Sequence, residues 1–270
     1  MPIKLYDLVT VPGGNGRFFS PACVRTRLSL MTKGVAFEVV EVTYHDLRFT
    51  WKEKLGVEKA TAPFIEREDG SLLMDSFEIA KWLDKTYPDQ QNLFLPEAPL
   101  PVDVNSEDYK AAVQEYEEHE KTPRKLDPPL YKTLFSLYAP RIAQLFDEET
   151  REYWTSDKRL GTGVWKSLLS RTPEDDEKAL KAIKAGLVAL SPSEFPNGQK
   201  FVSSASKPGL KDFSLLGSYR LIRAVSPRFA AETFEAPDAG EWPHWLKRMA
   251  EAYPLPEYWE RDPQQEVDRR

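Results

Sequence analysis

The sequence predicts a mixed α/β domain at the N-terminus and an all-helical domain after it. In the first 95 residues, strand-like and helix-like segments follow one another in the order β-α-β-α-β-β-α. A proline-rich linker occupies residues 96–101, where repeated prolines stiffen the chain and stop a helix. From residue 102 to 261 apolar residues recur with helical spacing, and the polar residues 262–270 are expected to form a loose tail.

The first half of the α/β domain has clear start and stop signals. A strand is predicted at 3–9, and a helix at 21–33 begins after Ser20, a good N-cap residue. Gly34 ends this helix, because glycine readily adopts the left-handed backbone of a helix terminus. Residues 36–42 alternate between apolar and polar side chains, which indicates a second strand.

The second half of this domain contains a hairpin between two helices. A short helix is predicted at 46–55, and strands at 63–66 and 71–74 flank a glycine-containing turn. A further helix opens at Asp75 and ends before Tyr87. The complete order of elements is that of a thioredoxin-like domain.

Composition excludes several classes of partner. The 270 residues carry a net charge of −6 without a long basic tract, which argues against nucleic acid or an anionic membrane as partner. No apolar run approaches the ~20 residues of a membrane helix. The N-terminal residues indicate a strand and not a signal peptide. The single cysteine, Cys23, fits a reducing cytosol, so a cytoplasmic location is expected.

Three motifs, together with the two-domain architecture, resemble the glutathione transferase superfamily. They correspond to the catalytic serine of its serine-type classes, the loop with the cis-proline, and the acidic-Ser pair that holds the γ-glutamyl group. In chain order they are Ser20-Pro21, Thr61-Ala62-Pro63-Phe64 and Asp75-Ser76. Segments 25–28, 75–88 and 153–161 further resemble the fungal etherase-related class.

The resemblance implies that Ser20 donates a hydrogen bond to the glutathione sulfur and stabilises its thiolate. The position itself supports this role, because the N-terminus of a helix favours an anion, including a thiolate. The alternative is that Ser20 only caps the helix, a contribution of about 1 kcal/mol.

The other two motifs imply the rest of a glutathione site. Pro63 is expected to be cis, so that the backbone of Ala62 meets the cysteinyl group of glutathione like an added strand. Asp75 and Ser76 are expected to bind the γ-glutamyl ammonium and carboxylate. The alternatives are a trans proline at the start of a strand, and Asp75 acting with Glu78 as a helix cap.

Other residues have less definite assignments. The glycyl carboxylate of glutathione could pair with Lys59, with His45 or with Lys52. Cys23 could form a mixed disulfide with glutathione, or be a small packing residue of the first helix. His119 is flanked by glutamates and is expected to be exposed. No His or Cys cluster has the spacing of metal ligands, so no metal is expected.

A hydrophobic small molecule is expected as second substrate, bound between the domains. Five aromatic residues of the helical domain are available to line that site: Tyr109, Tyr116, Tyr131, Phe135 and Tyr138. The resemblance thus implies a homodimeric transferase that conjugates glutathione to hydrophobic aromatic electrophiles, or cleaves them with it. The alternatives are a non-catalytic ligandin or regulatory protein on the same fold, and a thiol-disulfide reductase that uses Cys23.

Overall fold

The computed structural model describes residues 2–14, 16–125, 130–254 and 267, without the side chains of 122–125, 130 and 131. Its N-terminal part is built on a four-stranded sheet with the order β2-β1-β3-β4. β1 pairs in parallel with β2 and antiparallel with β3, and β3 pairs antiparallel with β4. The strands are β1 Ile3–Leu8, β2 Phe37–Val42, β3 Phe64–Glu66 and β4 Leu72–Met74. This mixed sheet confirms the predicted thioredoxin-like domain.

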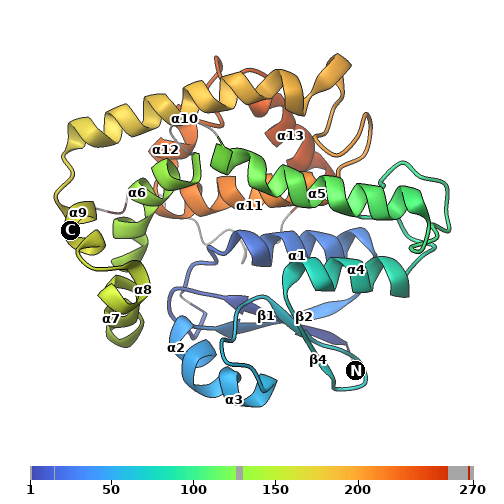
Figure 1. Cartoon of the computed structure of the whole chain (residues 1–270), viewed down its shortest axis with the longest axis horizontal. Coiled ribbons are helices and arrows are strands. Elements are labelled where there is room, and N and C mark those ends of the chain that lie inside the picture. Colours follow the sequence, from blue (N-terminus) through green and yellow to red (C-terminus); the bar gives the residue numbers. More distant parts are fainter. Residues whose placement is uncertain (1, 15, 126–129, 255–266, 268–270) are drawn as a thin grey trace.

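Two helices separate this sheet from the helical domain (Figure 1), namely α1 Pro21–Thr32 and α4 Ser76–Thr86. Between β2 and β3 the chain forms three short helical turns. These are α2 Tyr44–Asp46, the π-helical turn η1 Leu47–Trp51, and α3 Lys52–Leu55.

Helix α1 begins and ends where its sequence signals indicate. The hydroxyl of Ser20 accepts a hydrogen bond from the Cys23 amide at 3.3 Å, which satisfies one of the unpaired amides of the first turn. At the other end, Gly34 has a φ of +64° and its amide donates to the Met31 carbonyl at 2.9 Å. The strand-to-helix junction at Ser20 is therefore fixed by local bonding.

All regular elements described after β4 are helical, which confirms the predicted all-α C-terminal domain. Its helices are α5 Glu107–Lys125, α6 Leu130–Ala143, α7 Glu148–Thr155, α8 Asp157–Leu160, α9 Val164–Leu169, α10 Pro173–Glu194, the 3-10 turn η2 Pro196–Gly198, α11 Leu210–Val225, α12 Pro227–Glu232 and α13 Trp242–Ala252.

Helix α11 is the central helix of this domain and packs against α1 (Figure 1). The two helices meet at a glycine, because a Cβ added at Gly217 would lie 2.6 Å from the carbonyl oxygen of Pro21. The start of α1, including Ser20, is therefore held directly against the helical domain.

A buried carboxylate also joins the two domains. Lys33 at the end of α1 forms an ion pair of 2.7 Å with Asp84 of α4, and both side chains are fully buried. Asp84 accepts further hydrogen bonds from the Leu93 amide at 2.9 Å and from the Tyr109 hydroxyl of α5 at 3.2 Å. Because a buried charge is tolerated only when it is well partnered, this network fixes α4 and α5 relative to α1.

Most of the predicted tail, residues 262–266 and 268–270, lies outside the described residues. Val267 is described, and here the chain is packed: its amide donates to the Val225 carbonyl at 3.1 Å and its side chain is buried. This differs from the loose tail expected from composition. Within the described ranges, no helix is long and apolar enough to span a bilayer.

Candidate active site

Ser20 lies where two cavities meet. Its side chain is only 8% exposed, yet it contributes to the lining of both cavities. The hydrogen bond from the Cys23 amide orients the Ser20 hydroxyl. The positive end of the α1 helix dipole points to the same place. Ligands in the two cavities would therefore share Ser20 as a neighbour.

The first cavity, called the basic cavity below, has a volume of about 500 Å³ and lies against the end of β1, α2 and the loop before β3. It brings together three of the residues predicted from sequence: Ser20, Lys59 and Ala62. Its charged lining residues are all cationic, namely Arg48, Lys59 and Arg159. Such a cavity suits a ligand with an anionic group.

The second cavity, called the apolar cavity below, has a volume of about 320 Å³ and lies between α1 and the helical domain. Six of its lining residues are large and apolar: Leu134, Leu187, Leu190, Leu215, Phe234 and Trp242. Its charged and titratable lining residues are of both signs: Arg25, His119, Glu120 and Glu194. A concave apolar surface with a few polar groups is the usual form of a small-molecule site.

The bond between Ala62 and Pro63 is cis, as the resemblance implied. Ala62 is half-buried and lines the basic cavity, and Pro63 directly precedes β3. Lys59 is exposed at the rim of the same cavity. The loop before β3 thus places a backbone segment and a cation on the side of Ser20.

Asp75 and Ser76 lie at the start of α4 and line neither of these two cavities. The Oδ1 atom of Asp75 accepts hydrogen bonds from the amides of Phe77 at 2.8 Å and Glu78 at 3.3 Å, so this residue does cap the helix. Its φ is +80°, which is uncommon for a residue with a side chain, and such outliers concentrate at ligand sites.

Arg25 joins Ser76 to the rest of the site, a connection that the sequence did not reveal. Its Nη2 donates to the Ser76 hydroxyl at 2.6 Å, and its Nη1 donates to the Ser214 hydroxyl of α11 at 2.9 Å. Nη1 also donates to the hydroxyl of Tyr116 and pairs with Glu120 at 3.1 Å, both on α5. One guanidinium group therefore contacts α4, α5 and α11.

Two of the sequence candidates are placed elsewhere. His45 of α2 does not line the cavities at Ser20, and its Nε2 lies 3.2 Å from Oε2 of Glu149 on α7. Lys52 is exposed and lines neither cavity. Among the three residues considered for the glycyl carboxylate, the structure therefore groups only Lys59 with Ser20.

Cys23 is 1% exposed, and burial together with the nearby charge of Asp7 raises the pKa of its thiol well above the usual value. Because the thiolate is the nucleophile, a buried protonated thiol is a poor redox centre. Cys23 has the surroundings of a packing residue, which was one of its two predicted interpretations.

The helical domain differs from expectation in its polar residues. His119 is mostly buried instead of exposed, and its Nε2 lies 2.8 Å from Oε2 of Glu194 on α10. Among the candidate aromatic residues, Phe135 lines the basic cavity, whereas Tyr109, Tyr116 and Tyr138 are buried in the protein interior. The Tyr131 side chain lies outside the described part of the chain.

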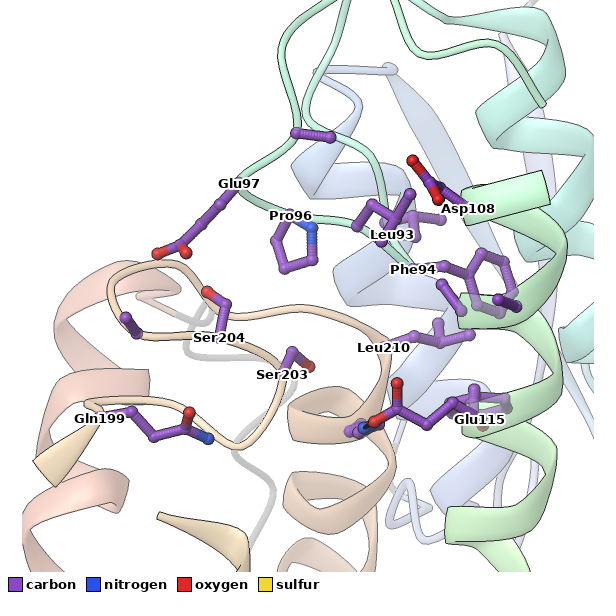
Figure 2. A pocket seen from close by; sticks show the side chains of 17 residues that line it. Leu93, Phe94, Pro96, Glu97, Asp108, Glu115, Gln199, Ser203, Ser204 and Leu210 are labelled. Carbon is purple, nitrogen blue, oxygen red and sulfur yellow. Dashed lines mark hydrogen bonds and ion pairs between the residues drawn. The ribbon is translucent and has the colours of Figure 1, made fainter. Parts of the chain in front are cut away.

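A larger cavity, of about 680 Å³, is lined by none of the predicted glutathione-site residues, although Tyr116 of the candidate aromatic residues contributes to its wall. In Figure 2, Pro96 and Glu97 of the linker face the loop with Ser203 and Ser204, and Asp108 and Glu115 of α5 form another wall. Glu97 accepts hydrogen bonds from the amide and hydroxyl of Ser206, at 2.7 and 2.6 Å. The walls of this cavity belong to the junction between the linker and the helical domain. The largest volume among these cavities therefore does not mark the candidate active site.

Comparisons with known proteins agree with the fold. Residues 16–91 match the family model of the glutathione S-transferase N-terminal domain. A glutathione S-transferase of Ceriporiopsis subvermispora, CsGST63524, solved in complex with glutathione, superposes with a TM-score of 0.70 at 20% identity, covering 95% of this chain and 100% of that one. Glutathione transferase GSTFuA3 of Phanerochaete chrysosporium gives 0.67 at 19% identity, covering 95% and 99%.

The beta-etherase LigF of Sphingobium sp. strain SYK-6 superposes with a TM-score of 0.56 at 18% identity, covering 97% of this chain and 100% of that one. No curated protein matches the sequence. At these identities, likeness to solved structures establishes the fold. The family match concerns residues 16–91, which resemble the N-terminal domain of glutathione S-transferases. Among the described residues, no group of His, Cys, Asp and Glu could hold a metal ion.

Proposed function

We propose that the protein is a glutathione transferase in which Ser20 stabilises the thiolate of glutathione. The observation that carries this proposal is the position of the Ser20 hydroxyl, at the N-terminus of α1 and on the wall that the basic and apolar cavities share. The match of residues 16–91 to the glutathione S-transferase N-terminal domain supports it. The structure of the Ceriporiopsis protein was solved in complex with glutathione, which is the ligand proposed here.

Glutathione would extend from the start of α4 to the basic cavity. Its γ-glutamyl ammonium and carboxylate would meet Asp75 and Ser76, and its cysteinyl backbone would pair with Ala62 before cis-Pro63. Its glycyl carboxylate would pair with Lys59. Arg48 lines the same cavity and is a second candidate for this carboxylate.

The reaction needs no protein nucleophile. A free thiol has a pKa near 8.5, and a hydroxyl donor at a helix N-terminus lowers it by about a unit. The glutathione thiol loses its proton to solvent, and the sulfur then attacks an electrophilic carbon of the second substrate. The C–S bond forms as the leaving group departs with its electron pair. Positioning of the two substrates supplies the rest of the acceleration.

The second substrate would be a hydrophobic aromatic electrophile in the apolar cavity. This assignment follows from the six large apolar side chains that face the space beside Ser20. An aryl ether is one such electrophile, in keeping with the resemblance to the etherase-related class and with the etherase among the structural neighbours. A cytoplasmic location and a homodimeric assembly, both expected from the sequence, complete the proposal.

Calorimetric titration with glutathione, followed by turnover assays with a panel of aromatic electrophiles, tests this function. The proposal predicts binding of glutathione and conjugation of at least one electrophile at a rate that falls in Ser20→Ala. Binding without turnover would favour the ligandin on the same fold. Absence of glutathione binding would contradict the proposal.

A further inference from the structure

Arg25 has an unusual set of partners for a residue that the proposed mechanism does not use. Its side chain is 13% exposed, and its two terminal nitrogens make hydrogen bonds to α4, α5 and α11. It also lines the apolar cavity, one turn along α1 from Ser20. A buried guanidinium group is costly, and it persists where its position serves a purpose that a neutral residue cannot serve.

The bond to Ser76 has a direct chemical consequence. A serine hydroxyl has one proton and two lone pairs, so a hydroxyl that accepts from Arg25 Nη2 at 2.6 Å keeps its own proton for a different partner. Because the donor is charged, it also makes the hydroxyl a stronger donor. Ser76 is therefore prepared to donate a hydrogen bond to an anion.

The surrounding charges favour an anion at the same place. Glu120 is the carboxylate that pairs with Arg25, at 3.1 Å, and it is 40% exposed, so solvent weakens its compensation of the guanidinium charge. The other partners, Ser76, Ser214 and the Tyr116 hydroxyl, are neutral groups. Asp75 is the second acid that interacts with Arg25, and it is exposed at the helix start. Ser76 also lies at the N-terminus of α4, where the positive end of the helix dipole favours an anion.

We propose that Arg25 is a positioning residue for the γ-glutamyl carboxylate of glutathione, acting through the Ser76 hydroxyl. Arg25 holds Ser76 as a donor and supplies the positive charge behind it, while Asp75 receives the ammonium group of the same amino-acid moiety. The inference rests on the proposed function, since it assigns a role within the glutathione site. It adds a residue of α1 that the three sequence motifs do not include.

The test compares glutathione with an analogue in which 4-aminobutyrate replaces the γ-glutamyl residue, so that the α-carboxylate is missing. We expect the wild-type protein to bind glutathione about tenfold more tightly than the analogue. Arg25→Gln should reduce this ratio to about two by weakening glutathione alone, and Arg25→Lys, which keeps the charge, should restore part of it. A merely structural role of Arg25 would weaken both ligands equally.

Two further variants keep the test decisive if Arg25→Gln fails to fold. Ser76→Ala leaves the other partners of Arg25 in place and should reduce the ratio as Arg25→Gln does. Tyr116→Phe removes one partner of Arg25 but neither its charge nor Ser76, and should leave the ratio unchanged.

An unchanged ratio in Ser76→Ala, or equal wild-type affinities for the two ligands, would overturn the role of Arg25 while glutathione binding still supported the proposed function. If the wild-type protein binds neither ligand, the proposed function itself fails.

Discussion

The basic cavity and the apolar cavity share one residue, Ser20, and differ in almost every other respect. The charged residues that line the basic cavity are three cations, drawn from η1, from the loop before β3 and from α8. The apolar cavity is lined mainly by leucine side chains of α6, α10 and α11 and by the aromatic side chains of Phe234 and Trp242. Its charged lining residues are of both signs. Each cavity therefore favours a different kind of ligand.

This difference explains why the hydroxyl lies at their junction. A polar, anionic peptide such as glutathione fits the basic side, and a neutral aromatic molecule fits the apolar side. A transferase has to bring a charged donor and a hydrophobic acceptor together at a single sulfur atom. The contrast between the two cavities provides this division, and each prediction below acts on one side or on their junction.

The largest effect is expected at the junction itself. In Gly217→Ala the added Cβ would lie 2.6 Å from the Pro21 carbonyl, and backbone on both sides limits relaxation. We expect a loss of about 2 kcal/mol in the free energy of unfolding, measured by urea denaturation, with weaker binding in both cavities. Val188→Ala on the exposed face of α10 is the control and should change stability by less than about 0.5 kcal/mol. Equal stability of both variants would contradict the tight packing of α11 on α1.

The apolar cavity should respond alone to a polar substitution in its wall. Leu190→Asn removes apolar surface from α10, and a loss of about 1 kcal/mol of transfer free energy corresponds to roughly fivefold weaker binding of a neutral probe such as naphthalene. Glutathione affinity should stay unchanged in the same sample. Calorimetry with each ligand checks the pair, and parallel losses would show that the cavities are not independent.

The basic cavity should respond to the loss of its rim cation. Lys59→Gln should weaken glutathione binding about threefold, with a smaller effect at high salt, because Lys59 is exposed and solvent screens its charge. Lys52→Gln is the matched control, since Lys52 is also an exposed lysine but does not line the cavity. A loss of equal size in both variants would indicate a general charge effect and not a contact with the glycyl carboxylate.

The smallest effect is expected at Cys23, which is buried and lines neither cavity. Because the pKa of its thiol is raised by burial, it should stay protonated and unreactive toward a disulfide reagent at pH 8 in the native state. The same reagent should titrate one thiol after unfolding in urea. Glutathione-dependent turnover of Cys23→Ala should equal that of the wild type. Rapid labelling of the native protein would return the reductase hypothesis to consideration.

Local signals were enough to predict the framework of this molecule. Ser20 before Pro21 and the glycine at position 34 mark both ends of α1, because caps depend on neighbouring residues. The cis geometry before Pro63 was expected from family resemblance, and sequence chemistry alone would have favoured trans. These elements bring Ser20 and Ala62 to the same cavity.

Long-range contacts could not be predicted in the same way. Arg25 reaches Ser214 across 189 positions of sequence, and His119 meets Glu194 across 75. A charged residue on a helix normally faces solvent, so nothing local distinguishes Arg25 from the exposed glutamates beside His119. Arg48 of η1 and Arg159 of α8 are likewise far apart in the sequence and line one cavity only in the folded protein. The charged residues of the candidate site could therefore be identified only from the tertiary structure.

The central claim is that the Ser20 hydroxyl stabilises a glutathione thiolate. It is tested most directly by a pH titration of the ultraviolet thiolate absorbance of bound glutathione. In the wild type we expect a midpoint below that of free glutathione, and in Ser20→Ala a midpoint higher by about one unit, equivalent to about 1.4 kcal/mol. Ser20→Thr keeps the hydroxyl and should titrate like the wild type, whereas Ser20→Gly keeps most of the cap and should titrate like Ser20→Ala. The same midpoint in all four proteins, with glutathione bound, would contradict the account and leave Ser20 as a helix cap.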